Sequence, residues 1–395
     1  MGANHGHGKT AGANALIFAY DTGDTRNSYK GEHTTNLTTD TPSGTGWAGE
    51  YTVVDSSTKT FTIQSKQNNS ATTSAWRTHY WSVSSYIGSY VTISADVEFI
   101  SETDCTFQHL HMGQGNTGSY PYHIAGSNVA DKVKIDTKPI EKVHLTWSGV
   151  INATGIVGFT QWINNVTANG ANSILKVSNV QIEAKSHATQ FVNGTRSVTE
   201  GLKDLTGNTS IDLTNAGFNS NAEIDLDGTG DFIKASSTHS ITSDITLEAV
   251  FNEDAASAPH TTVICTDTGH QYGVKLMSYK NSNRYGLWLG FGSSSYVAMY
   301  AGTLDNDTTY HLVGSWNQST GVVKVYLNGV LKSTLSTGQT SAISLNEAKV
   351  VIGADYHSLS YGLNGKVYVG KVYDKVLTAG EVKTNYNNYK GRFNI

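Results

Sequence analysis

Cysteine, proline and charge are all scarce in this chain. Its 395 residues include 2 Cys and 4 Pro, and charged residues make up only 15% of the sequence. Cys105 and Cys265 fall in different predicted domains, so neither a disulfide within one domain nor a zinc site made by cysteines alone is expected. Stability therefore does not depend on an oxidising compartment. The net charge is −5 and no basic block is present, which argues against nucleic-acid binding.

Long apolar runs are missing as well. No segment approaches the roughly 20 apolar residues of a membrane-spanning helix. Residues 1–9 lack the basic start and the apolar run of a secretory signal peptide. We therefore expect no membrane insertion and synthesis in a host cytoplasm. Residues 1–14 are rich in Gly, His and Ala and are predicted to form a flexible arm.

Glycine and aromatic residues are abundant instead, with 40 Gly, 21 Tyr, 11 Phe and 7 Trp. Glycine supplies turns, and the rings are sufficient to fill hydrophobic cores. Residues 89–100 alternate polar and apolar side chains, which is the period of a strand with one buried face. Runs of this kind recur from residue 37 to 191 and again beyond residue 197. The pattern predicts an all-β protein with two β-sandwich (jelly-roll) domains.

Two local signals are more specific than the strand pattern. Asn328 and Gly329 separate two strand-like runs, which predicts a two-residue hairpin turn. Thr378 is followed three residues later by Glu381, the spacing of a capping box. We therefore predict one helix over residues 378–389.

The C-terminal half resembles the laminin-G-like, concanavalin A-like lectin/glucanase domains. Residues 353–382 match their C-terminal signature: a strand ending in Gly, a variable loop, Asn-Gly, a strand ending in Tyr, and a Leu-Thr-x-x-Glu helix start. Upstream segments fit the same pattern in the same order, namely 227–233, 245–251, and 310–316 leading into 325–329. The resemblance implies a concanavalin A-like sandwich.

The N-terminal residues 16–31 resemble the opening strand of a subgroup of these domains. In that subgroup an Asp-Leu-x-Gly-Asn motif follows soon afterwards, whereas here the motif appears only at residues 204–208. The resemblance thus implies a discontinuous lectin-like domain. Its first strand would come from residues 15–33, an inserted β jelly roll would occupy 34–196, and the rest of the domain would occupy 197–395.

The insert resembles carbohydrate-binding-module jelly rolls. Its final segments, 177–183 and 188–196, resemble parts of tailed-phage virion proteins. This implies a non-enzymatic protein of the virion surface, such as a fibre, decoration protein or adhesin. It would bind host or environmental glycans, contact other virion proteins and form a homo-oligomer. Two alternatives stay open: a purely structural subunit-contact module without ligand, and a glycoside hydrolase of concanavalin A-like fold.

Catalysis has weak support in the sequence. Retaining glycoside hydrolysis needs two carboxylates about 5 Å apart, which a Glu-x-Asp-x-(x)-Glu strand supplies. The nearest match is Glu223-Ile-Asp225-Leu-Asp227, which lacks the second Glu and lies near the start of the domain. We therefore expect no enzymatic activity and no required cofactor.

Sugar sites combine an aromatic platform with hydrogen-bonding side chains. Packing within a core or sheet is the competing interpretation for rings on strands, and it is favoured for Trp288. His109 and His111 share one strand face. Calcium is common in the rim loops of the resembling family, with Asp305 and Asp307 as candidate ligands and a polar turn as the alternative. The carbohydrate candidates are Asp355, Tyr356, His357, Tyr361, Tyr272 and Trp288 in the lectin-like domain, and Trp76, Trp81, His109, His111, Tyr120 and Tyr122 in the jelly roll.

Overall fold

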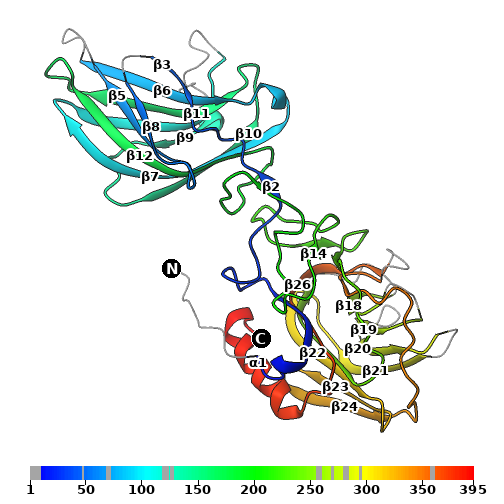
Figure 1. Ribbon diagram of the computed structural model, residues 1–395. Coiled ribbons are helices and arrows are strands. Elements are labelled where there is room, and N and C mark those ends of the chain that lie inside the picture. The colour runs from blue at the N-terminus through cyan, green and yellow to red at the C-terminus, as the bar shows by residue number, and fades with distance from the viewer. Residues whose placement is uncertain are drawn as a thin grey trace. The chain divides into compact units, whose positions relative to one another are not determined.

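The computed structural model is almost entirely β-structure with one C-terminal helix, as the sequence predicts (Figure 1). It describes residues 10–46, 49–67, 73–117, 124, 129–254, 260–267, 271–278, 284–292, 296–355 and 361–395. Residues 1–9 of the predicted flexible arm lie outside these ranges. The same holds for four candidate site residues: Tyr120, Tyr122, Tyr356 and His357.

The chain divides into two compact units. Unit 1 comprises Met1–His33, Ser197–Asn219 and Glu223–Ile395, and unit 2 comprises Thr34–Arg196 and Ser220–Ala222. Residues on both sides of unit 2 therefore belong to unit 1. Strand β1 (Leu16–Asp21) pairs antiparallel with strand β26 (Asn364–Tyr373), which places the N-terminal strand beside the last strand of the chain.

Two sheets and a helix make up unit 1. The first sheet, called the helix-side sheet because helix α1 (Ala379–Phe393) contacts it, contains in spatial order β1, β26, β17 (Ile245–Glu253), β22 (Thr308–Asn317), β23 (Val322–Leu327) and β24 (Val330–Ser336), with β15 (Leu226–Asp227) also paired to β26. The second sheet contains β14 (Ile211–Asp212), β16 (Ile233–Ala235), β25 (Val351–Ile352), β18 (Thr262–Cys265), β19 (Val274–Ser278), β20 (Arg284–Gly290) and β21 (Tyr296–Thr303).

Apolar side chains from both sheets fill the space between them. Leu247 and Trp316 of the helix-side sheet join Leu276 and Leu287 of the second sheet in one buried cluster. Burial of apolar surface between the two sheets supplies most of the stabilisation of such a sandwich, at roughly 25 cal/mol per Å² of apolar surface. Trp316 is fully buried in this core.

The predicted hairpin and capping box are both present. Asn328 and Gly329 join β23 to β24 with φ angles of 49° and 72°, the left-handed values that a type I′ turn requires. Thr378 caps α1, and Glu381 completes the capping box. The helix runs four residues further than predicted, because Tyr389 and Phe393 still pack against apolar neighbours of unit 1.

The Asp-Leu-Thr-Gly-Asn segment at 204–208 covers the free edge of β1. A carboxylate oxygen of Asp204 accepts the Ala19 backbone N–H at 2.9 Å, and the Leu205 N–H donates to the Ala19 carbonyl at 2.7 Å. The Asn208 side-chain amide donates to the Ile17 carbonyl at 3.1 Å. An uncovered edge strand invites pairing with other chains, so this loop protects the edge that the N-terminal strand creates.

Unit 2 is a β-sandwich with a core of its own. One sheet contains β10 (Val143–Val150), β7 (Tyr90–Thr103), β12 (Asn172–Glu183), β5 (Thr60–Lys66) and β4 (Tyr51–Asp55) in spatial order. The other contains β3 (Ser43–Gly46), β6 (Ser74–Ser82), β11 (Ile156–Asn164), β8 (Thr106–Gln114) and β9 (Lys132–Ile135). A short pair, β2 (Thr34–Thr35) with β13 (Thr195–Arg196), closes the unit where the chain enters and leaves it. Phe61, Ile93 and Phe159 lie in the core.

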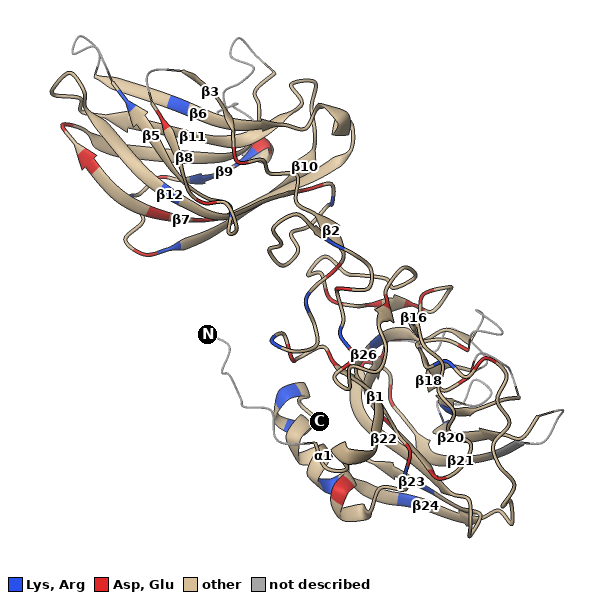
Figure 2. Cartoon of the chain, in the orientation of Figure 1, with Lys and Arg blue, Asp and Glu red and all other residues tan. Residues whose placement is uncertain are grey.

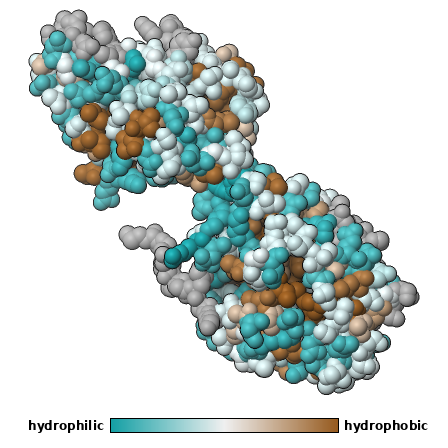
Figure 3. Space-filling model, viewed as in Figure 1, coloured by the Kyte–Doolittle hydropathy of each residue, from teal (hydrophilic) through white to brown (hydrophobic). Residues whose placement is uncertain are grey.

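Charge and hydropathy are distributed without a dominant block. Figure 2 shows Lys, Arg, Asp and Glu scattered over strands and loops of both units. On the face seen in Figure 3, hydrophobic patches alternate with hydrophilic surface on each unit. Within the part of the chain that the structure describes, no helix has the length and apolar character needed to cross a membrane.

Candidate functional site

A set of rings facing away from the core lies on three neighbouring strands of unit 2. In the register of the sheet, Trp162 on β11 lies opposite Trp76 on β6 and opposite His109 on β8. The ring centroids of Trp76 and Trp162 are 6.0 Å apart, and those of His109 and Trp162 are 5.4 Å apart. Trp76, Trp162, His109 and His111 are called the aromatic row below. Its first three rings are half-buried, so part of each reaches the surface.

Two imidazoles form one end of the aromatic row. The rings of His109 and His111 stack with centroids 4.5 Å apart, which confirms that they share a strand face. Burial lowers the pKa of His109 to about 4 and that of His111 to about 3, so both rings are neutral at neutral pH. A neutral imidazole offers one hydrogen-bond donor and one acceptor, which suits a hydroxyl group.

The strands beneath the row are joined by buried polar contacts. The hydroxyls of Thr78 and Thr160 hydrogen-bond at 2.7 Å, and Thr160 also accepts the Ile124 backbone N–H at 2.9 Å. The Ile124 carbonyl lies 2.8 Å from His111 Nδ1. His111 Nε2 is buried without a hydrogen-bond partner among the described residues. These contacts fix the inner end of the row, while Trp76 and Trp162 form its more open part.

Only part of the predicted jelly-roll cleft therefore comes together. Trp76, His109 and His111 meet as described, but Trp81 is 4% exposed and belongs to the core, where its indole N–H donates to the Thr39 carbonyl at 3.0 Å. Sequence reasoning missed Trp162, although strand alternation carries the signal. Phe159 of the same strand faces the core, so Trp162, three positions later, faces the opposite side.

In unit 1, Asp355 and Trp288 meet around a buried lysine. The Asp355 carboxylate forms an ion pair with Lys275 Nζ at 2.6 Å, and both side chains are 1% exposed. The Lys275 ammonium lies 5.0 Å from the centroid of the Trp288 ring, and Arg284 stacks in a similar way on Tyr300 at 5.1 Å. Cation–π contact of this kind stabilises a ring without removing it from the surface. Trp288 is half-buried, whereas Asp355 directs its charge to Lys275 instead of to solvent.

Two further candidates of unit 1, Tyr361 and Tyr272, lie among the described residues. Tyr361 packs edge-on against His260, with centroids 5.1 Å apart. Tyr272 is half-buried, with its backbone beside Gly290 and its ring beside Gly292.

Asp305 and Asp307 form an exposed turn between β21 and β22. Asp307 has a φ of 55°, and its backbone N–H donates to the Glu253 carbonyl at 2.8 Å. The Asp305 N–H donates to the Tyr310 hydroxyl at 3.1 Å. Among the described residues, no three His, Cys, Asp or Glu side chains are grouped so that they could hold a metal ion. Calcium binding stays a prediction.

The glucanase-like segment places Glu223 at the surface in an ion pair. Its Oε2 accepts a hydrogen bond from Asn219 Nδ2 at 2.9 Å and lies 3.3 Å from Lys366 Nζ. The hydrogen bond from Asn219, followed by Lys366, lowers the pKa of Glu223. A general acid needs the opposite, because it must hold its proton near neutral pH.

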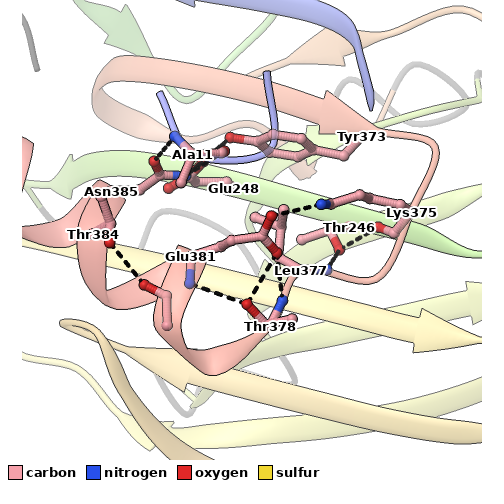
Figure 4. A network of polar contacts seen from close by, with 11 residues as sticks. Ala11, Thr246, Glu248, Tyr373, Lys375, Leu377, Thr378, Glu381, Thr384 and Asn385 are labelled. Carbon is pink, nitrogen blue, oxygen red and sulfur yellow. Dashed lines mark hydrogen bonds and ion pairs between the residues drawn. The ribbon is translucent and has the colours of Figure 1, made fainter. Parts of the chain in front are cut away.

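A buried polar network beneath helix α1 was not predicted from the sequence. Glu248 on β17 is fully buried and accepts hydrogen bonds from His311 Nε2 at 2.7 Å, from Asn385 Nδ2 at 3.1 Å and from the Tyr373 hydroxyl. Figure 4 shows Asn385 reaching from the helix toward Glu248 and Ala11. The Ala11 backbone N–H donates to Asn385 Oδ1 at 2.9 Å, so the network also holds the described end of the N-terminal arm.

This network is structural in its geometry. Burial alone would raise the pKa of Glu248, but the His311 hydrogen bond and the nearby Lys371 charge leave it below its usual value. Neither Glu248 nor His311 is exposed to solvent. A buried carboxylate with several donors locks the groups around it in place, here a helix, a sheet and the arm.

Comparison with known families agrees with the fold of unit 1. Residues 227–383 match the model of a family described as the concanavalin A-like lectin/glucanases superfamily (Laminin_G_3). Unit 1 thus contains a concanavalin A-like domain. The matched segment takes in the second sheet from β16 to β21, most of the helix-side sheet and the start of α1. No curated protein sequence matches the chain.

Three solved structures are similar to parts of this chain. The ligand-binding domain of botulinum neurotoxin serotype D, in complex with N-acetylneuraminic acid, is 18% identical over 49% of this chain and 49% of that chain, with a TM-score of 0.37. Domain 4 of AbnA, a GH43 extracellular arabinanase from Geobacillus stearothermophilus in complex with arabinotriose, is 17% identical over 48% of this chain and 93% of that chain, with a TM-score of 0.37. A heptameric SAP-like pentraxin from Limulus polyphemus is 19% identical over 40% of this chain and 78% of that chain, with a TM-score of 0.34. The chain spans about half the length of the toxin domains it matches.

Proposed function

We propose that this chain is a non-enzymatic glycan-binding protein whose aromatic row on unit 2 contacts the sugar. One observation carries the proposal: Trp76, Trp162 and His109 lie side by side on three adjacent strands, half-buried and facing away from the core. A row of rings in this position offers a platform for the apolar C–H faces of sugar rings. The concanavalin A-like domain of unit 1 supports the same class of ligand.

The polar part of recognition would come from the imidazoles. His109 is neutral at physiological pH and lies at the half-buried end of the stacked His pair. Its ring can donate to or accept from a sugar hydroxyl without the desolvation penalty of a charged group. This arrangement favours hydroxyl-rich, uncharged parts of a glycan at this surface.

The absence of enzymatic activity is part of the proposal. The sequence supports it because Glu223 and Asp225 lack the second Glu of a glucanase strand. The pKa of Glu223, lowered by Asn219 and Lys366, also opposes a role as general acid. Release of reducing sugar from a bound polysaccharide, abolished by Glu223→Gln, would overturn this part.

The biological setting we propose is the surface of a tailed-phage particle. Its support is the resemblance of segments 177–183 and 188–196 to virion proteins. Other virion proteins, further copies of this chain and host or environmental glycans would be its partners. Mass spectrometry of purified particles, followed by a map of the intact assembly, tests this directly. A chain found only in the host-cell fraction, and never in particles, would contradict it.

A glycan array tests the proposed binding. The intact chain should bind a subset of immobilised glycans, and Trp162→Ala should reduce that binding by about tenfold or more. Tyr90→Ala is the matched control, because Tyr90 is an exposed ring (54% exposed) on the other sheet of unit 2. The control should leave binding unchanged. An array without signal for the folded chain would leave the purely structural alternative as the better account.

A further inference from the structure

A hollow lies in unit 1, lined by residues of β26, α1 and the segment after β1. It has a volume of about 200 Å³. Ligand pockets for drug-sized molecules span about 300–1,000 Å³, so this hollow has room for roughly one sugar ring. Its lining includes Tyr29, Glu223, Val367, Tyr368 and Phe393.

Aromatic side chains form the apolar part of the hollow. The rings of Tyr368 and Phe393 are stacked with centroids 5.1 Å apart, and Tyr29 adds a third ring to the lining. Tyr368 projects from β26, whereas Phe393 is the last residue of α1. Two of the three rings are therefore anchored on a strand and a helix.

The charge around the hollow is negative. Glu223 lines it directly, and Asp225 and Asp254 are close enough to Tyr368 that, after burial, they help to raise the pKa of its hydroxyl. Lys366 is the cation that acts on the same hydroxyl. The charge of the nearby Arg392 is neutralised by Asp21, because its two terminal nitrogens, Nη1 and Nη2, donate to the Asp21 carboxylate at 2.7 and 2.6 Å. Three carboxylates against one lysine leave an excess of negative charge.

We infer that this hollow binds an amino sugar, with the sugar ring against the aromatic wall and its ammonium group beside the Glu223 carboxylate. The inference rests on the proposed glycan binding and adds a second site with a distinct chemical preference. An apolar wall suits the C–H face of the ring. A carboxylate that keeps its charge is an acceptor only, so it pairs with a cationic donor and not with another anion.

Removing Lys366 can either strengthen or weaken ligand binding, and the direction of that change tests the inference. It pairs with the same oxygen of Glu223 that accepts from Asn219, so it competes with a bound ammonium group for that carboxylate. If Glu223 binds the ligand, removing Lys366 should strengthen binding. If the ion pair only shapes the hollow, removing either partner should weaken it.

The experiment is titration calorimetry on the intact chain at about pH 6, where an aliphatic amine is protonated. The probes are the methyl glycosides of glucosamine, N-acetylglucosamine and glucose. We expect the glucosaminide to bind at least about tenfold more tightly than either neutral sugar. Glu223→Gln should remove that preference, Lys366→Gln should increase it, and Phe393→Ala should weaken glucosaminide binding.

The control is Glu347→Gln, which removes an equal charge from an exposed position of unit 1. It should not change the preference. Equal binding of all three glycosides, or a preference that survives Glu223→Gln, would overturn the inference. The Trp162→Ala variant keeps the two claims separate, because it should weaken binding at the aromatic row by about tenfold or more and leave the glucosaminide preference intact. Nα-acetyl-lysinamide binding as tightly as the glucosaminide would refute the assignment to a sugar.

Discussion

The two units differ in some of the polar groups that they bury. Unit 1 encloses full charges in pairs, with Glu248 near Lys371 under the helix and Asp355 against Lys275 on the second sheet. Unit 2 encloses imidazoles whose pKa values burial has lowered, among them His79 and His111. Both devices satisfy the requirement that a buried group be paired or neutral. They differ in what makes them destabilising. A buried charge destabilises the fold when its partner is removed, whereas a buried neutral imidazole destabilises it when the pH favours its protonation.

The largest effect should follow from breaking the buried network of unit 1. Glu248→Ala leaves His311, Tyr373 and Asn385 without their common acceptor. We expect the free energy of unfolding of unit 1 to fall by about 3–5 kcal/mol. Differential scanning calorimetry should show the transition of unit 1 moving to lower temperature while that of unit 2 stays in place. A loss below about 1 kcal/mol would mean that the network adds little to stability.

The second-largest effect should come from acidification, which we expect to destabilise unit 2 more than unit 1. The pKa of His79 is about 4 in the folded state and 6.5 when unperturbed, so the unfolded state takes up a proton first as the pH falls. The contribution of neutral His79 to the free energy of unfolding is complete above about pH 6.5 and is lost as the pH falls below that value. The loss is about 2 kcal/mol at pH 5. His109 and His111 act in the same direction.

Unit 1 should respond less over the same range. In unit 1, burial lowers the pKa of His239, and the lowered pKa of Glu248 has an effect only below its ordinary value of 4.5. Melting curves between pH 7.5 and 5 should therefore show the transition of unit 2 falling faster. His79→Leu should flatten its pH dependence. Parallel shifts of both transitions would contradict the comparison.

The smallest loss of stability should come from removing the N-cap of α1, which is a surface contact of unit 1. Thr378→Ala removes the side-chain acceptor that caps α1, for which we expect a loss of about 1 kcal/mol. Chemical denaturation of Thr378→Ala and Thr378→Ser side by side measures this, because Ser restores the cap. A loss as large as that of Glu248→Ala would show that helix docking, and not the buried network, dominates unit 1.

Local patterns in the sequence predicted the local structures well. The strand at 89–100, the Asn-Gly turn and the Thr378 capping box each depend on neighbours a few residues apart, and each is present, although Thr92 and Ser94 on the predicted polar face of the strand are buried. The all-β class and the concanavalin A-like domain follow from several such patterns in order. The domain boundaries rest on a different kind of argument, the displaced 204–208 motif, which in the structure covers the edge of β1.

Long-range partners could not be predicted in the same way. Glu248 stands between the apolar residues Leu247 and Ala249, which is a visible anomaly, but its partners His311, Tyr373 and Asn385 lie far along the chain. The outward position of Trp162 could be predicted from the alternation of its strand alone. Its contacts with Trp76 and His109 could not, because they depend on sheet register. Asp355 was expected to face a ligand, and no local pattern indicates that Lys275 pairs with it.

The central claim is that glycan binding depends on the aromatic row of unit 2. The most direct test is the affinity of a glycan selected on the array for two single-tryptophan variants, Trp162→Ala in unit 2 and Trp288→Ala in unit 1, measured by titration calorimetry. The account predicts at least about a tenfold loss for Trp162→Ala and little change for Trp288→Ala. Full affinity in Trp162→Ala, with binding lost in Trp288→Ala, would contradict it and would move the site to the lectin-like unit.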